Sequence, residues 1–243
     1  MKALKTSIIF FAALIVFAGA KAQTADEIIN KYIAAIGGKD KINTIKTFYY
    51  ESTMDVMGNE AGSITYIING KAYKSETDFN GQKIIQCITD KGGWAVNPLA
   101  GQTAAEELPK EMLKGGATQY SVMGASFIDY AAKGSKVEMQ GKEKVNNNSA
   151  YKLKMTTSDS AVVTYYIDST TNYLVKAITT VNANGQQMET AIGFLNYQKT
   201  DFGYSFPMTQ QVDLPQGISL TLTVKKVEVN KDIDPKIFEM PKS

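Results

Sequence analysis

Arginine and histidine are both absent from this chain of 243 residues, and cysteine occurs once, as Cys87. Without histidine there is no imidazole base, no catalytic triad that depends on one, and no histidine metal ligand. One cysteine cannot form an intrachain disulfide or a cysteine-rich zinc site. Without arginine there is no bidentate fork for phosphate, carboxylate or guanine. These absences exclude the reaction classes that need those groups, whereas lysine or carboxylate catalysis stays possible and needs positive evidence. We expect no enzymatic activity, no metal and no cofactor.

The chain also lacks a large excess of charge of either sign. The chain has 26 basic residues, all lysines, against 24 acidic ones. Nucleic-acid binding depends on clustered positive charge, so this near balance predicts no nucleic-acid partner. Long apolar runs are missing beyond the N-terminus, which predicts no transmembrane helix in the remainder of the chain.

The first 22 residues have the pattern of a signal peptide. Lys2 and Lys5 precede an apolar run over residues 8–17, and Ala20 and Ala22 form a small-x-small cleavage pattern. The residue after the cut is Gln23 rather than a cysteine, so the mature chain is not expected to be lipidated itself. We expect cleavage after Ala22, and a monomeric periplasmic protein whose single domain spans residues 23–243.

The mature chain begins with a predicted helix. Thr24 and Glu27 have the spacing of a capping box. Apolar residues then recur at helical spacing, and Gly37 and Gly38 end the pattern. This apolar stripe consists of Ile28, Ile29, Tyr32, Ile33 and Ile36. Such a helix must pack on another element.

From residue 47 the apolar period changes from 3.6 to 2. Glycine–asparagine pairs at 58–59, 69–70, 80–81 and 184–185 predict tight hairpins. The expected strands cover 48–55, 63–68, 71–76, 83–89, a short strand around Trp94, 150–156, 161–167, 174–181, 189–197, 208–212 and 218–229. Short connections between about ten strands predict an antiparallel meander.

The strand pattern is interrupted between residues 97 and 134. A second capping box at 103–106, a turn after Pro109 and a helical stretch over 126–133 are expected there. A strongly twisted sheet of this size usually curls or packs on itself. We expect the helices to cover its open face, and whether residues 97–134 form a moving lid stays open.

Three possible catalytic groups have simpler interpretations. Ser149 and Lys152 match the S-x-x-K pattern, but they lie in a predicted strand, whereas that pattern works on a helix. The neighbouring acidic residues at 106–107 are interpreted as solvated charge. Cys87 has no electropositive neighbour in sequence, which favours a small buried hydrophobe over a nucleophile.

Several strings, in order, resemble the LolA-like superfamily of periplasmic outer-membrane lipoprotein carriers and sorting proteins. They are TADEIINKYIAAIGGKDKI, DKGGWAVNPLAG, GKEKVNNNSAYKLKM, VVTYYIDSTTNYLVKA, NANGQQMETAIGFLNYQ, GYSFPM and DIDPKIFEMP. The resemblance covers nearly all of residues 24–243. It implies a mainly β fold with some α, in which one curved antiparallel sheet forms an unclosed, half-open β-barrel covered by helices.

The resemblance also implies a function. Family members hold acyl chains of lipoproteins or other lipids in a hydrophobic cavity, use no cofactor and catalyse no covalent change. An inner-membrane donor and an outer-membrane acceptor protein would be the partners. The studied carriers use an arginine in the lid-and-cavity region to favour hand-off, and this chain has none. An alternative is a lipid- or lipoprotein-sensing module that signals to a membrane partner.

Flexible thioethers and aromatic rings suit a cavity that repacks around variable apolar ligands, although the same residues could simply form the core. Alternation along the strands selects the positions expected to point inward. Position within residues 97–134 selects the lid candidates. The predicted ligand-binding residues are Phe48, Tyr50, Met54, Tyr66, Trp94 and Val96 on strands, and Met112, Met123 and Phe127 on the lid.

Overall fold

The computed structural model describes residues 23–56, 59–183, 186–213 and 219–241. The predicted signal peptide and the predicted turn at 184–185 lie outside these residues. The helices are α1 (Ala25–Ala35), α2 (Lys39–Thr44) and α3 (Gly116–Gln119), and the 3₁₀ turns are η1 (Pro98–Ala100), η2 (Lys110–Leu113), η3 (Ala125–Phe127) and η5 (Pro235–Phe238). The strands are β1 (Thr47–Val56), β2 (Asn59–Ile68), β3 (Ala72–Phe79), β4 (Gln82–Thr89), β5 (Gly92–Val96), β6 (Glu106–Glu107), β7 (Lys136–Val145), β8 (Asn148–Thr156), β9 (Val162–Asp168), β10 (Leu174–Ala183), β11 (Gln186–Lys199), β12 (Ser205–Asp213) and β13 (Ser219–Val229).

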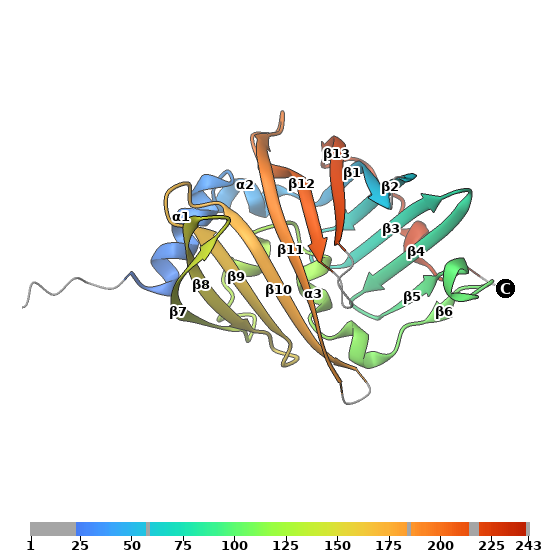
Figure 1. Ribbon diagram of the computed structural model, residues 1–243, viewed down its shortest axis with the longest axis horizontal. Helices are drawn as coiled ribbons and strands as arrows, with labels where there is room; N and C mark the ends of the chain where they lie inside the picture. Colours follow the sequence, from blue (N-terminus) through green and yellow to red (C-terminus); the bar gives the residue numbers. More distant parts are fainter. Residues whose placement is uncertain (1–22, 57–58, 184–185, 214–218, 242–243) are drawn as a thin grey trace, which may run out of the picture.

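All strands join one antiparallel sheet in the order β6-β5-β4-β3-β2-β1-β13-β12-β11-β10-β9-β8-β7. Two meanders of consecutive strands therefore meet where β1 pairs with β13. The sheet does not close, because β6 and β7 form its two edges. Figure 1 shows the two halves spreading apart from this junction, with the segment between β6 and β7 lying between them. The predicted unclosed antiparallel architecture is confirmed.

Three local predictions are wrong. The sheet has 13 strands rather than about ten, and β7 was missed because the apolar alternation of this edge strand is limited to Val137 and Met139 and the rest is mostly charged. Glu106, expected to complete a capping box, instead pairs with Ala95 as part of β6. The expected helix over 126–133 reduces to η3 followed by turns.

Helix α1 begins as the sequence predicts. The Thr24 hydroxyl accepts a hydrogen bond from the Glu27 amide, and the Thr24 amide donates to the Glu27 carboxylate, both at 3.2 Å. The predicted apolar stripe is buried, and Tyr32 and Ile36 are completely inaccessible to solvent. The stripe packs on one side of the sheet, which we call the inner face. The other side is the outer face.

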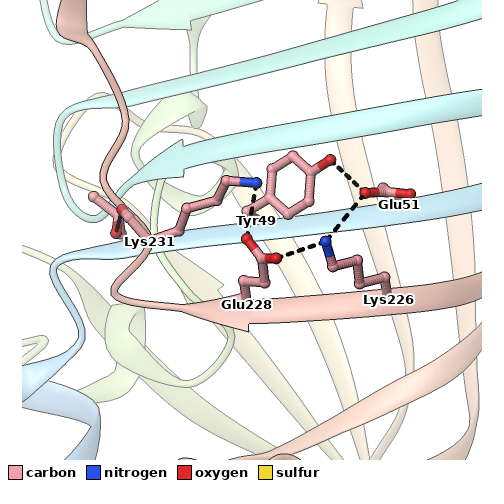
Figure 2. A network of polar contacts seen from close by, with 6 residues as sticks. Tyr49, Glu51, Lys226, Glu228 and Lys231 are labelled. Carbon is pink, nitrogen blue, oxygen red and sulfur yellow. Dashed lines mark hydrogen bonds and ion pairs between the residues drawn. The ribbon is translucent and has the colours of Figure 1, made fainter.

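A polar network lies on the outer face across the β1–β13 junction (Figure 2). The Tyr49 hydroxyl donates to Glu51 at 2.6 Å, and the Lys231 ammonium lies 3.6 Å from the centre of the Tyr49 ring. Lys226 and Lys231 both pair with Glu228, at 2.6 Å and 2.8 Å. Exposed ion pairs contribute little individually; the Lys231–Tyr49 cation–π contact and the Lys226–Glu51 pair, at 3.7 Å, link β13 and its C-terminal continuation to β1.

The C-terminal turn η5 covers part of the outer face. Asp234 caps it by accepting from the Lys236 amide, and Phe238 is buried. The Phe238 carbonyl accepts hydrogen bonds from the Trp94 indole at 3.0 Å and from the Cys87 thiol at 3.3 Å. Burial raises the pKa of the Cys87 thiol to about 11. The thiol is thus a buried, unreactive group, as predicted.

Candidate functional site

The inner face carries the main apolar cluster of the protein. Phe48 is central to it, because its ring lies 4.8 Å from that of Phe206 and 5.7 Å from that of Tyr204. The cluster combines residues of α1 and β1 with others from strands β8 to β13. Both halves of the sheet therefore contribute to one continuous apolar surface.

Residues 122–128, which we call the cover segment, lie against this surface. The Phe127 ring is 3% exposed and lies 4.7 Å from the ring of Tyr165 and 5.7 Å, edge-on, from that of Tyr32. Gly124 has a φ of 90°, and a β-carbon there would overlap Ile36 on α1. Apart from the single turn η3, the cover segment has no helix or strand.

A few hydrogen bonds tie the cover segment to its surroundings, including those from the Tyr197 hydroxyl to the Met123 sulfur at 3.4 Å and from the Lys133 ammonium to the Ala125 carbonyl at 3.0 Å. The Tyr204 hydroxyl donates to the Met123 carbonyl at 2.8 Å. The Val122 amide donates to the side chain of Asn69 in the β2–β3 turn at 3.0 Å. Attachment is thus mainly by apolar packing, with few polar contacts.

One polar atom beneath the cover segment is unusual. The Tyr32 hydroxyl is completely buried, and no hydrogen-bond partner is found for it among the described residues. Burial, with a smaller contribution from nearby Tyr197, raises its pKa well above the ordinary value. Buried hydroxyls are normally paired. The inner face therefore has an unused hydrogen-bonding position in an otherwise apolar environment.

The structure brings together some of the predicted ligand-binding residues. Phe48 and Phe127 are buried in the inner cluster, and Tyr50 and Met123 pack against it. Met54 follows Tyr50 on the same side of β1 by strand alternation. Met112 lies on η2 and is 48% exposed.

The prediction that all nine residues share one inward surface is wrong for Tyr66, Trp94 and Val96. Tyr66 pairs across strands with Tyr49, so it lies on the outer face, and Trp94 packs there under η5. Val96 packs against the same outer cluster. Alternation along one strand divides its side chains between two faces. The pairing register with the neighbouring strand decides which residues of that strand lie on the same face.

An open cavity of about 710 Å³ lies next to the cover segment. Its walls come from the β4–β5 turn, the stretch from η2 through α3, and the β8–β9 turn. Four lysines line it, namely Lys91, Lys110, Lys114 and Lys133, but none of the nine predicted residues does. No motif in the sequence could have grouped these lysines, because they are scattered and only the fold assembles them.

Residues 23–56, 59–183, 186–213 and 219–241 contain no group of three or more side chains placed to hold a metal ion. Within the same ranges, no helix has the length and apolar character needed to cross a membrane.

No family model matches the sequence, and no curated protein matches it either. Solved structures are similar at the level of the fold. A DUF1329 family protein from Desulfovibrio piger superposes with a TM-score of 0.57 at 14% identity, over 90% of this chain and 98% of that one. A LolA superfamily protein from Nitrosomonas europaea gives 0.57 at 13% identity, over 90% and 98%.

A domain assigned to outer membrane lipoprotein sorting, from Vibrio parahaemolyticus, gives a TM-score of 0.53 at 15% identity, over 87% of this chain and 94% of that one. Together with the unclosed sheet, these similarities define the class of fold. The chain has a LolA-like fold, as the sequence resemblance implied. At these identities the similarity describes architecture alone.

Proposed function

We propose that the protein is a periplasmic, non-catalytic carrier that binds an acyl chain of a lipid or lipoprotein on the inner face and moves it toward the outer membrane. The observation that carries the proposal is the packing of Phe127. An aromatic side chain from an irregular segment is buried against Tyr32 and Tyr165, within an apolar surface to which both halves of the sheet contribute. An acyl chain has the same chemistry as the groups that it would replace.

The magnitudes favour such an exchange. Burying an acyl chain contributes about 0.8 kcal/mol per CH₂, so a chain of about sixteen carbons contributes about 12 kcal/mol. Burying one large apolar side chain contributes about 1.5–3 kcal/mol. A bound chain could therefore displace Phe127 and Met123 at a cost well below its own gain. Because displacing these side chains offsets part of the free energy of burying the acyl chain, the chain could still be released to a membrane.

Phe48, Tyr50 and Met54 would line the chain, and Phe127 and Met123 would be displaced by it. The sequence resemblance supports a route from an inner-membrane donor to an outer-membrane acceptor. A single domain over residues 23–243, exported through residues 1–22, is part of the same proposal. The LolA-like architecture supports it at the level of the fold.

A fluorescent fatty acid titrated into the purified protein tests the proposal. Phe127→Ala should raise the affinity for the probe by up to about tenfold, since the competing ring is gone. Trp94→Phe is the matched control, because Trp94 lies on the outer face and the substitution should leave the affinity unchanged. Absence of probe binding in both the unsubstituted protein and Phe127→Ala would refute the proposal.

Native mass spectrometry on protein purified from the cell envelope identifies the cargo. A bound lipid or lipoprotein would support the carrier. A protein partner that stays bound, with no delivery of lipid to acceptor vesicles, would favour the sensing module instead.

A further inference from the structure

The open cavity next to the cover segment, which we call the lysine cavity, concentrates positive charge. Four lysines and two aspartates line it, whereas the whole chain has 26 basic and 24 acidic residues. Lys91 comes from the β4–β5 turn, Lys110 begins η2 and Lys114 follows it, and Lys133 precedes β7. Segments far apart in the sequence therefore place lysine ammonium groups around one cavity.

Most of this charge is not neutralised within the part of the chain that the structure describes. There, no carboxylate lies within 4.0 Å of the ammonium groups of Lys91, Lys110 or Lys114. Lys133 donates to the Ala125 carbonyl at 3.0 Å, a neutral acceptor. Two carboxylates, Asp90 and Asp159, line the cavity beside the four lysines, so its lining carries more positive than negative charge.

Asp159, one of the two aspartates, has other partners. Its carboxylate accepts a hydrogen bond from the Gly115 amide at 2.7 Å and another from the Thr157 hydroxyl. Burial acts to raise the pKa of Asp159, but these hydrogen bonds outweigh burial and hold the pKa below its ordinary value. This carboxylate joins two walls of the cavity instead of pairing with a lysine.

The remaining lining is partly apolar. Leu113, Ala117 and Tyr120 face the cavity, and so does Met155. Met155 is 1% exposed and also belongs to the inner apolar cluster. The floor of the lysine cavity is therefore in contact with the surface that the cover segment occupies.

We infer that the lysine cavity holds the anionic head group, a phosphate or carboxylate, of an amphiphile whose apolar chain continues past Met155 toward the inner face. The inference rests on the proposed function and specifies its cargo as an anionic amphiphile. A volume of about 710 Å³ is within the range of ligand sites, and mixed apolar and charged lining matches an amphiphile.

The cations that line the cavity are lysines rather than arginines, and this determines how reversible and how salt-dependent the binding should be. An ammonium group is a compact, strongly hydrated point charge without the bidentate geometry of guanidinium. Attraction from several lysines at an open mouth is screened by salt. Binding of the head group should therefore be reversible and should weaken as sodium chloride is added.

The test compares two lysophospholipids with the same chain, lysophosphatidylglycerol (anionic) and lysophosphatidylcholine (zwitterionic), by calorimetric titration into the full protein. Lys110→Gln/Lys114→Gln should weaken the anionic lipid by about tenfold and leave the zwitterionic lipid within about twofold. Lys31→Gln/Lys144→Gln is the matched control. It removes the same charge from exposed positions outside the cavity and should change neither affinity.

A second variant tests the apolar part of the proposed binding site. Ala117→Trp places a large ring in the cavity mouth from an exposed position and should weaken both lipids. Circular dichroism verifies that each variant is folded.

Each alternative outcome is distinct. Equal binding of both lipids, unaffected by Lys110→Gln/Lys114→Gln, overturns the head-group site but leaves the carrier in place. Inorganic phosphate binding as tightly as the anionic lipid would mean a site for a free anion and overturns the inference. Binding to phosphatidylglycerol vesicles without binding of the monomeric lipid would assign the lysines to a membrane surface. Binding of neither lipid refutes the proposed function itself.

Discussion

Two buried tyrosines on the inner face allow the same chemical change to be made in opposite environments. Tyr32 and Tyr204 are both completely inaccessible to solvent. The Tyr204 hydroxyl donates to the Met123 carbonyl at 2.8 Å, whereas no partner is found for the Tyr32 hydroxyl among the described residues. Replacement by phenylalanine removes one oxygen in each case, so differences in apolar packing largely cancel.

The expected effects on the free energy of unfolding have opposite signs. A buried hydroxyl without a partner costs about 1–3 kcal/mol, so Tyr32→Phe should stabilise the protein by about 1 kcal/mol. Tyr204→Phe loses a hydrogen bond and leaves the Met123 carbonyl without this partner, so it should destabilise by about 1–2 kcal/mol. For a domain of this size, each kcal/mol shifts the melting temperature by about 2–4 °C.

Urea unfolding followed by far-UV circular dichroism measures both variants, and an unchanged m-value verifies that the comparison is valid. The reasoning is refuted if Tyr32→Phe destabilises the protein as much as Tyr204→Phe does. That result would mean that the Tyr32 hydroxyl has a partner in solution, such as an ordered water or a polar group of a bound ligand.

Three further predictions concern the outer face and one buried carboxylate. Phe238→Ala should cost about 3 kcal/mol and shift the emission of Trp94, the one tryptophan, to longer wavelength, whereas Met240→Ala, at a 39% exposed side chain, should do neither. Burial acts to raise the pKa of Asp168, but the hydrogen bonds that its carboxylate accepts from the Thr170 and Thr171 amides and the Thr171 hydroxyl outweigh burial and hold the pKa below its ordinary value. The stabilisation is therefore present above the ordinary pKa and is lost as the pH falls through the lowered pKa. Asp168→Asn should cost about 1–2 kcal/mol at neutral pH and flatten the acid limb of the stability curve. Cys87, with its pKa raised to about 11, should react with a thiol reagent at pH about 8 only after denaturation, and rapid labelling of the folded protein would contradict its burial.

Local patterns predicted the elements that have one buried side. Helix α1 follows from its capping box and apolar stripe, and most strands follow from alternation, because each of these signals lies within a few consecutive residues. Strand β7 could not be predicted in this way, since only Val137 and Met139 at its start pack against the inner cluster and the rest of this edge strand is mostly charged and exposed.

The candidate site was predictable only in part, because alternation does not relate one strand to the next. Phe48 and Tyr50 lie on the inner face with the apolar stripe of α1, whereas Tyr66 and Trp94, expected on the same surface, lie on the outer face. Both faces of this sheet bury aromatic residues, the outer one under η5, so hydrophobicity alone cannot distinguish them. The lysine cavity needs contacts between segments far apart in sequence, and these exist only once the strands are in register.

The sheet order has a consequence for how the chain folds. Every strand pair within the two meanders joins consecutive strands, while β1 and β13 join the beginning of the sheet to its end. Local hairpins form in microseconds, but closing a long loop costs entropy before any contact forms. Each half can thus assemble early, and the β1–β13 junction is expected to form last. Strand β13 would then complete the sheet, and a chain cut before β13 would retain two unjoined halves with exposed edges.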